Sequence, residues 1–484
     1  MKLSSVRKNA VLNTAKQLCQ VLFPIVTIPY VTRILGAQNY GKINFSNSIV
    51  NYCILLASLG INSYAIREGA LFRDNKRKFN KFSSEVFSIN IYSTIFAYLI
   101  LFLLLFIPQL AKYRSLILIQ GLAIILTTLG ADWINSVYED YLYISIRYIA
   151  FQLIALVLLF TFVHKKSDYL IYAFIMVVAT AGGNILNVFY IRKYTKLKFT
   201  FHIDWKKHLL PIIILFGNQV AITIYVNSDI TMLGLLSSVT SVGWYSLSSK
   251  IYTVIQQILN ALLIVTVPRL SYYLGENKFN KFNELIINLK QALLILIVPL
   301  MVFIFCFSDS IMSIVGGEQY IKGSMSLGIL AITVLFSLLA ALYTNCVLLP
   351  CKLEKKILTI TSTAAIINIL LNIWLIPHMG ATGAAITTLI SEITVAAWSY
   401  KVALKVTDIK LAIKNYKDIC SLIIGGVVVA IACNIIKYTL NIKPIFLIAL
   451  ALITTIIVYV LVLLLFKNTV ICNEIDKYKQ RRHL

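Results

Sequence analysis

The sequence predicts an all-α membrane protein with about 14 transmembrane helices. Of its 484 residues, 59% are hydrophobic and only 13% are charged, and the mean hydropathy is +0.84. Apolar stretches follow one another almost without interruption, and each is long enough to cross a hydrocarbon layer of about 30 Å as a helix. Because lipid offers the backbone no hydrogen bonds, only helices or closed barrels can span it. No room remains for a sizeable soluble domain.

Each predicted helix ends where proline, glycine or charged residues interrupt the apolar run. Pro108, Pro268, Pro350, Pro377 and Pro444 lie at such ends. The segments between the runs are short, which excludes an extramembrane catalytic domain. In chain order, the predicted helices are 10–33, 43–65, 82–107, 115–137, 143–163, 169–191, 209–236, 243–267, 285–308, 324–349, 357–376, 381–404, 418–437 and 444–466.

The charge pattern predicts the orientation. A net charge of +25 would suggest a nucleic-acid partner for a soluble protein, but here most basic residues lie in alternate loops, as topology signals do. This bias places the N-terminus in the cytoplasm, and an even number of helices places the C-terminus there too. The first ten residues are polar and basic, and the apolar run after them is too long for a cleavable signal peptide. We expect a multi-pass membrane protein with no nucleic-acid partner.

The two halves of the sequence echo each other. Residues 32–36 end the first helix and Gly41 opens the second, while residues 231–234 end the seventh and Gly243 opens the eighth. This spacing predicts a six-helix unit repeated in parallel. The predicted parts are an N-terminal lobe of residues 1–200, a C-terminal lobe of residues 201–405, and residues 406–484 with two extra helices and a basic cytoplasmic tail.

Four segments spread over most of the chain carry a family pattern. They are FPIVTIPYVTRILG at 23–36 with Tyr40 and Gly41, Asp132 to Ile144, Asp229 with the glycines that follow it, and 380–385 with Glu392. Together they resemble Wzx-type polysaccharide flippases of the multidrug/oligosaccharidyl-lipid/polysaccharide exporter superfamily. The chain departs from the family at Ser136 and Val137, where a Gln-Gly pair is common, and this leaves the role of that segment open.

The resemblance implies a transporter in which two six-helix lobes form a V around a central cavity. Its substrate would be an undecaprenyl-diphosphate-linked oligosaccharide, moved by alternating access from the cytoplasmic to the outer leaflet of a bacterial inner membrane. A sugar's hydroxyls each cost several kcal/mol to strip of water, so the head group needs a polar path. No bond is broken, so we expect no catalytic residues. A polysaccharide polymerase and a chain-length regulator are the implied partners of a monomeric flippase.

Charged residues inside the helices are candidates for function, because each costs about 2.5–3.5 kcal/mol at the membrane centre on insertion scales. Lys16 lies inside the first helix. Asp229 and Lys250 lie at matching depths in the seventh and eighth helices and could form an ion pair. Two interpretations stay open: a purely structural pair, or a Lys250 that attracts diphosphate or acidic sugar while Asp229 holds it or takes a coupling cation.

Arginines and carboxylates extend this set. Arg33 and Arg67 stand near helix ends, where an arginine either snorkels to the interface or grips phosphate with its planar fork. Glu392, and less so Asp132 and Glu85, could bind Na⁺ or a proton and so couple transport to an ion gradient. Arg147 we interpret as a topology residue.

Amide side chains recur at helical spacing on four helices. The cavity candidates among them are Asn47 and Asn51 in the second helix, Asn218 in the seventh and Gln256 in the eighth. The four rows occupy the equivalent helix pairs of the predicted repeat. Interhelical hydrogen bonding explains them as well as a sugar-binding cleft does, but their concentration in the equivalent pairs favours a cavity.

Other kinds of site find no support in the sequence. The eight cysteines have no metal-binding spacing and mostly read as small core residues. Five scattered histidines form no recognisable site, and no phosphate-binding loop has the Walker spacing. We therefore expect no metal and no cofactor apart from Na⁺ or H⁺ as the coupling ion.

Three alternatives remain. A multidrug or cation exporter of the same superfamily would have a smaller and more acidic cavity, and Lys250 with the amide rows argues against it. A membrane-embedded glycosyl transferase or polymerase would carry a large outer loop or paired acidic residues near an interface. The lipid II flippase of peptidoglycan synthesis is the nearest competitor, because it too has fourteen helices.

Overall fold

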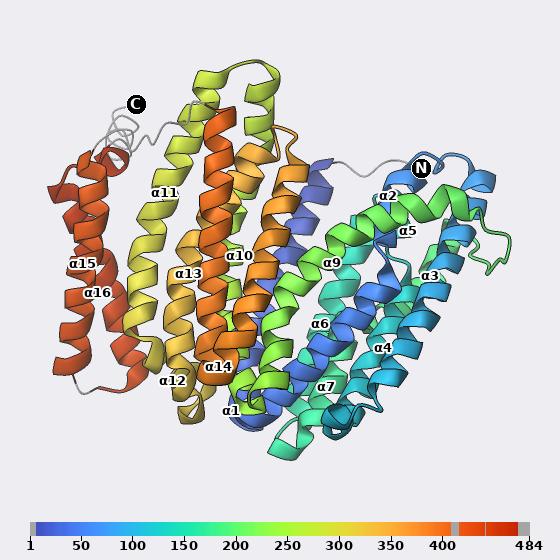
Figure 1. Ribbon diagram of the computed structural model, residues 1–484, viewed down its shortest axis with the longest axis horizontal. Coiled ribbons are helices and arrows are strands. Elements are labelled where there is room, and N and C mark those ends of the chain that lie inside the picture. Colours follow the sequence, from blue (N-terminus) through green and yellow to red (C-terminus); the bar gives the residue numbers. More distant parts are fainter. Residues whose placement is uncertain (1–5, 408–415, 441, 473–484) are drawn as a thin grey trace. The chain divides into compact units, whose positions relative to one another are not determined.

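The computed structural model describes residues 6–407, 416–440 and 442–472, with side chains from residue 16 onward except at 218 and 416. This described part is helical and contains no strand (Figure 1). The side chain of Asn218, a predicted cavity residue, lies outside the described ones. The α-helices are α1 (Val6–Ser58), α2 (Ile61–Ala70), α3 (Lys76–Leu104), α4 (Arg114–Gly130), α5 (Trp133–Val137), α6 (Tyr141–Phe162), α7 (Tyr169–Val177), α8 (Asn184–Tyr190), α9 (Trp205–Leu236), α10 (Val239–Gly275), α11 (Phe279–Cys306), α12 (Ser308–Gly316), α13 (Ser324–Tyr343), α14 (Glu354–Val406), α15 (Tyr416–Thr439) and α16 (Pro444–Leu465).

Two sharp breaks in long helices bring the described residues to fourteen candidate membrane-spanning helices, in agreement with the prediction of about fourteen. Thirteen stretches of the described chain are long and apolar enough to span a membrane, and Lys16–Ala70, with 55 residues, is one of them. It breaks at Gly36 (φ 76, ψ 168), so it supplies two spans. The helix α14 breaks at Gly380 (φ 53, ψ −127), and its halves already count separately. A positive φ is cheap only for glycine, which explains the residue at both breaks.

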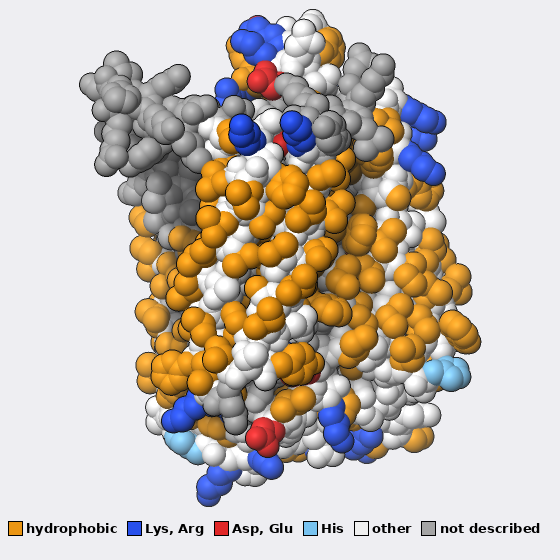
Figure 2. Space-filling model, turned by 90° about the vertical axis from the view of Figure 1, so that its left-hand side faces the viewer, with side chains coloured by type: hydrophobic (Ala, Val, Ile, Leu, Met, Phe, Trp, Pro, Cys, Tyr) orange, Lys and Arg blue, Asp and Glu red, His pale blue; other side chains and the backbone are white. Residues whose placement is uncertain are grey.

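The distribution of side chains is that of a membrane protein. Large apolar side chains such as Phe102, Val157 and Ile456 are more than half exposed, whereas Asn135 and Asn187 are fully buried. Figure 2 shows a broad apolar belt on one face, with lysine and arginine gathered toward its two ends. This arrangement confirms that the chain is built to lie in lipid, with its polar side chains packed inside.

The described chain divides into two compact units, residues 1–243 and 244–484. In the first unit, α1 packs against α3, α4, α6 and α9. In the second unit, α13 packs against α11 and α14, while α15 and α16 pair with each other and contact α11. The predicted lobe boundaries at residues 200 and 405 stay predictions.

A glycine contact joins α1 to the start of α10 inside the first unit. A methyl group added at Gly41 would lie 1.9 Å from the carbonyl oxygen of Val239 and 2.9 Å from the backbone nitrogen of Gly243. One added at Gly243 would lie 2.0 Å from the carbonyl oxygen of Ala37. The two glycines that mark the sequence echo therefore allow two backbones to touch, as small residues do between membrane helices.

Candidate functional site

The fourth span is interrupted where its first acidic residue stands. The helix α4 ends at Gly130, Ala131 adopts a left-handed conformation (φ 43), and α5 begins directly after Asp132. A side chain at Gly130 would collide with Asn184, 2.6 Å from its nearest atom. Broken helices at membrane depth often supply binding groups, because their backbone ends and capping side chains are not used up in the helix.

Asp132 belongs to a hydrogen-bonded network that reaches three helices. The Nη2 atom of Arg147 in α6 donates to both carboxylate oxygens, at 2.6 and 2.7 Å. The Nδ2 atom of Asn187 in α8 donates to Oδ1 at 2.9 Å, and Asn135 in turn donates to Asn187 at 2.7 Å. The Asp132 side chain is 43% exposed, whereas that of Arg147 is only 7% exposed. The sequence-based interpretation of Arg147 as a topology residue missed this buried pair.

Lys16 lies near the same network. Its ammonium group stands 5.4 Å from the ring centre of Tyr148, a cation–π distance, and it is close enough to interact electrostatically with both Asp132 and Arg147. Two predicted residues, Lys16 and Asp132, are thus brought together with Arg147. Together, Lys16, Arg147 and Asp132 give this part of the first unit a net charge of +1.

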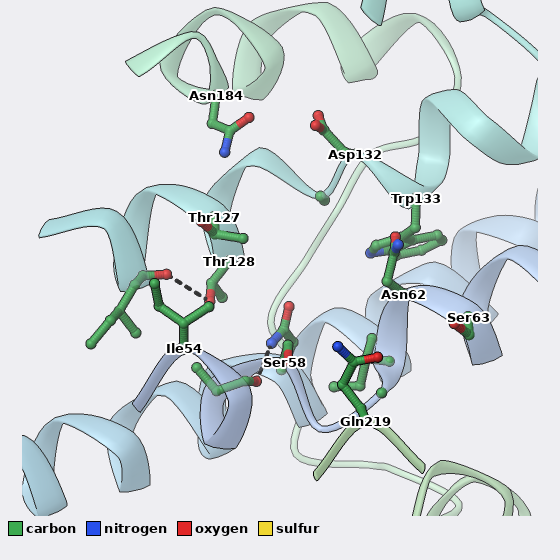
Figure 3. Close-up of a pocket in the computed structure, with 16 residues that line it drawn as sticks. Ile54, Ser58, Asn62, Ser63, Thr127, Thr128, Asp132, Trp133, Asn184 and Gln219 are labelled. Atoms are coloured by element: carbon green, nitrogen blue, oxygen red, sulfur yellow. Dashed lines mark hydrogen bonds between the residues drawn. The ribbon is translucent and has the colours of Figure 1, made fainter. Parts of the chain in front are cut away.

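A cavity of about 380 Å³ opens beside Asp132. In Figure 3 the labelled side chains come from α1 (Ile54, Ser58), α2 (Asn62, Ser63), α4 (Thr127, Thr128), α8 (Asn184) and α9 (Gln219), with Asp132 and Trp133 at the break. Hydroxyls, amides and one carboxylate therefore share the wall with apolar groups. Such a mixed lining can hydrogen-bond a polyol or hold a hydrated cation.

The other polar residues predicted in the first unit are scattered. Asn51 donates to Asn227 of α9 at 3.1 Å, so it forms an interhelical bond, and Asn47 is half-buried on the same helix. Arg33 is exposed. Arg67, 60% exposed, pairs with the neighbouring Glu68 at 3.0 Å. None of these four residues lines the cavity beside Asp132.

Asp229 and Lys250 fall in different units. Asp229 is buried in the first unit, and Lys250 is exposed on α10 in the second, so their ion pair stays a prediction. Gln256, one and a half turns after Lys250, is half-buried and donates to the Tyr252 hydroxyl at 3.2 Å. The central cavity between two lobes also stays a prediction.

A polar cluster in the second unit was not predicted. Within α14, the Thr387 hydroxyl donates to Asn372 at 2.6 Å, and Asn372 donates to Asn368 at 3.0 Å. Both asparagines are almost fully buried, and so is Glu392, a predicted ion-coupling residue just over one turn after Thr387. The signal was present in the sequence as two asparagines four residues apart in an apolar run, which places them on one helix face.

A third polar cluster involves a histidine to which the sequence analysis gave no role. His208, in the first turn of α9, is completely buried. Its Nε2 atom lies 2.7 Å from an oxygen of Glu85, and its Nδ1 atom lies 2.6 Å from the Tyr64 hydroxyl. The sequence analysis missed this cluster, in which three elements bring a carboxylate, an imidazole and a phenol together. The prediction that the histidines form no functional site stays a prediction.

In the residues that the structure describes, no three histidine, cysteine, aspartate or glutamate side chains are grouped so that they could hold a metal ion. The three clusters above instead consist of pairs of charges, amides and hydroxyls. These groups can bind hydroxyls, phosphate, a proton or a monovalent cation.

Comparisons with known proteins identify the family. The family model described as "Polysaccharide biosynthesis protein" matches residues 6–274, and that of MatE matches residues 214–374. The "Putative O-antigen transporter" of Escherichia coli (strain K12) is 25% identical over 398 residues, which cover 81% of this chain and 95% of that protein. The "Probable low-salt glycan biosynthesis flippase Agl15" of Haloferax volcanii is 25% identical over 165 residues, or 34% of each chain.

Among solved structures, the lipid II flippase MurJ in its inward closed conformation superimposes with a TM-score of 0.65. The match covers 93% of this chain and all of that one, at 19% identity, and so shows a shared fold. The named relatives are transporters and flippases, in agreement with the expectation that this chain is not an enzyme. The chain belongs to the polysaccharide biosynthesis protein family, which confirms the resemblance to Wzx-type polysaccharide flippases.

Proposed function

We propose that this protein flips an undecaprenyl-diphosphate-linked oligosaccharide from the cytoplasmic to the outer leaflet of a bacterial inner membrane. The observation that carries the proposal is the match to a putative O-antigen transporter over 95% of that protein's length. A second support is architectural. The described chain consists almost entirely of spanning helices, so its polar side chains must act within the membrane.

The physical task explains why polar clusters are placed inside an apolar protein. An oligosaccharide and a diphosphate cannot enter lipid without partners for their oxygens. Hydroxyls and amides such as Asn62, Thr127 and Asn184 can replace water around sugars. Lys16 and Lys250 supply positive charge for the diphosphate, one in each unit. The lipid tail can stay in the bilayer while the head group passes through a polar, positively biased chamber between two lobes.

An ion gradient supplies the energy in this proposal. Asp132, Asp229 and Glu392 are the carboxylates proposed to take Na⁺ or H⁺. Asp132 is the best placed of them within the first unit, since it is partly exposed beside a cavity while Arg147 and Asn187 hold it in position. Arrival of a cation would weaken the bond of Asp132 to Arg147, and this change can be transmitted to α6 and α8.

Deletion followed by complementation tests the function. Loss of the gene should abolish the surface polysaccharide and cause undecaprenyl-linked repeat units to accumulate on the cytoplasmic side, and the wild-type gene should restore both. If the mutant instead accumulates lipid II and lyses, the substrate is the peptidoglycan precursor. An unchanged surface polysaccharide with no accumulated intermediate contradicts the proposal.

A further inference from the structure

The cluster formed by Tyr64, Glu85 and His208 does not line the cavity beside Asp132, although the core around it shares Ile61 and Trp133 with that cavity. The three residues come from α2, α3 and α9, and none of them lines that cavity. Glu85 and His208 are 7% and 0% exposed at their side chains. The cluster lies in an apolar core that includes Ile61, Phe82 and Trp133. Burial in such a core costs free energy for each charge, so a buried ionisable pair suggests a function that offsets this cost.

The hydrogen bonds of this cluster are compatible with two protonation states of His208. With a neutral imidazole, Nε2–H donates to Glu85, and Nδ1 accepts from the Tyr64 hydroxyl. With one more proton, both ring nitrogens donate, and the Tyr64 oxygen becomes an acceptor by rotation of its hydroxyl. Both ring nitrogens of His208 keep a partner in either state. The net charge of the three residues changes from −1 to 0.

Few other charges face this cluster. On α3, the ammonium of Lys81 lies 3.8 Å from Glu85, but it is 80% exposed and screened by water. On α2, Arg67 and Glu68 act on Tyr64 with opposite signs, and at the start of α9 Asp204 adds a negative charge. The near neighbours Phe82 and Trp133 are uncharged. The charges nearest the buried pair are therefore the exposed ammonium of Lys81 and the groups around Tyr64.

We propose that Glu85 and His208, with Tyr64 as the hydrogen-bond partner, form a proton-binding site that controls how α9 is held against α2 and α3. This inference rests on the proposed transport function and assigns the coupling proton to a pair in which Glu85, a lesser candidate in the sequence, is joined by His208. His208 lies on the first turn of the seventh span, so a movement of this end of α9 away from both α2 and α3 must break both of its bonds. The loaded, ion-paired state resists that break more strongly than the unloaded one.

The direct test is titration of His208 in the purified full-length protein in nanodiscs, with ring-labelled histidine observed by NMR. The H208Q variant identifies the signal among the five histidines. We expect the ring signals of His208 to change with pH as the site takes up a proton. In E85Q, which lacks the carboxylate, this change should be lost or displaced. A histidine that keeps one protonation state throughout, or a midpoint that E85Q leaves unmoved, overturns the proposal.

A second measurement separates coupling from stability. Flipping of a fluorescent undecaprenyl-diphosphate-linked oligosaccharide in vesicles should depend on pH in the wild type and lose that dependence in H208Q. Y64F keeps the ring packing and should shift the midpoint without abolishing it, which provides a test if H208Q does not fold. The control H378N changes an exposed histidine on α14 and should behave as wild type.

The outcomes distinguish this inference from the proposed function. If His208 takes up a proton but the protein flips another substrate, the proton-site proposal holds and only the proposed oligosaccharide substrate is wrong. A wild-type pH dependence that persists in folded H208Q removes the site while leaving the flippase function intact.

Discussion

At the scale of single residues, the conformation of the segment after α5 depends on Asp140. One carboxylate oxygen accepts from the hydroxyls of Tyr194 and Tyr190, at 2.6 and 2.7 Å, and from Lys193 at 2.9 Å. Burial alone would raise the pKa of the Asp140 carboxyl, but the hydrogen bonds from Tyr194, Tyr190 and Lys193 outweigh it and hold that pKa below its usual range.

This shift predicts a pH dependence of stability. Because the folded pKa of Asp140 lies below its unfolded value of about 3.9, its contribution is fully present above that value and disappears as the pH falls through the folded pKa. The variant D140N should unfold at a lower temperature than wild type at neutral pH, and the gap should narrow as the pH falls below about 4. Thermal unfolding in detergent over a pH series measures it. A gap that is constant with pH would show that the carboxylate charge is not involved.

Asp132 carries a second prediction at this scale. Changing Asp132→Asn leaves the buried guanidinium of Arg147 without a charged partner. We expect the free energy of unfolding to fall by about 1–3 kcal/mol, less than for a fully buried pair because Asp132 is partly exposed. Thermal unfolding measures the change. The matched control D74N alters an exposed aspartate and should have little effect; equal losses in both variants would count against the pair.

The residue scale also shows what the sequence could not predict. Lys16 and Asp132 stood out because a charge in an apolar run is rare, and this signal needs no partner. The partners themselves were not predictable. Arg147 lies 15 residues from Asp132 on another helix, and His208 lies 123 residues from Glu85. Only the folded arrangement of helices shows which isolated polar groups meet.

At the scale of elements, the glycine contact determines how closely α1 and α10 can approach each other. The variants G41A and G243A each place a methyl group about 2 Å from a backbone carbonyl oxygen. Backbone cannot move aside as a side chain can, so we expect a loss of at least about 1–3 kcal/mol in stability. G275A is the control, since nothing lies within 4 Å of a methyl group there. Unfolding temperatures of all three variants in detergent give the comparison, and an unchanged G41A would refute the contact.

Elements were the most predictable part of this protein. Long apolar runs form helices because lipid offers the backbone no other partner, so length and hydropathy sufficed for thirteen stretches of the described residues. The break at Gly36 divides the first of them into two spans. The interruptions inside a span were missed for a physical reason. The break at Ala131 and the π-helical segments Val178–Gly182 and Thr344–Leu348 lie inside single long hydrophobic runs. The few polar residues there, such as Asp132 and Asn345, do not by themselves indicate a change of helix geometry.

At the scale of the whole molecule, each unit carries polar groups of its own. The first contains the Asp132 and His208 clusters, and the second contains Lys250 and the asparagines near Glu392. A carrier that works by alternating access needs groups in both halves whose binding of substrate or ion favours one arrangement over the other. The proposed chamber requires Lys250 to face the substrate.

Lys250→Ala tests this requirement. The variant should restore surface polysaccharide at least about tenfold more slowly than wild type, the effect of one lost charge-assisted contact of about 1.5–3 kcal/mol. Complementation of the deletion strain, with protein levels measured by immunoblot, gives the result. K401A removes another exposed lysine, at the end of α14, and should complement fully. Normal polysaccharide with K250A would exclude Lys250 from the substrate path.

The single-residue turns at Gly36 and Gly380 have a consequence for antibodies and proteases. They follow the first and the eleventh of the candidate spans. Each turn offers such reagents much less chain than a longer connection such as residues 307–323 after α11. The longer connection is therefore the better place for an epitope tag.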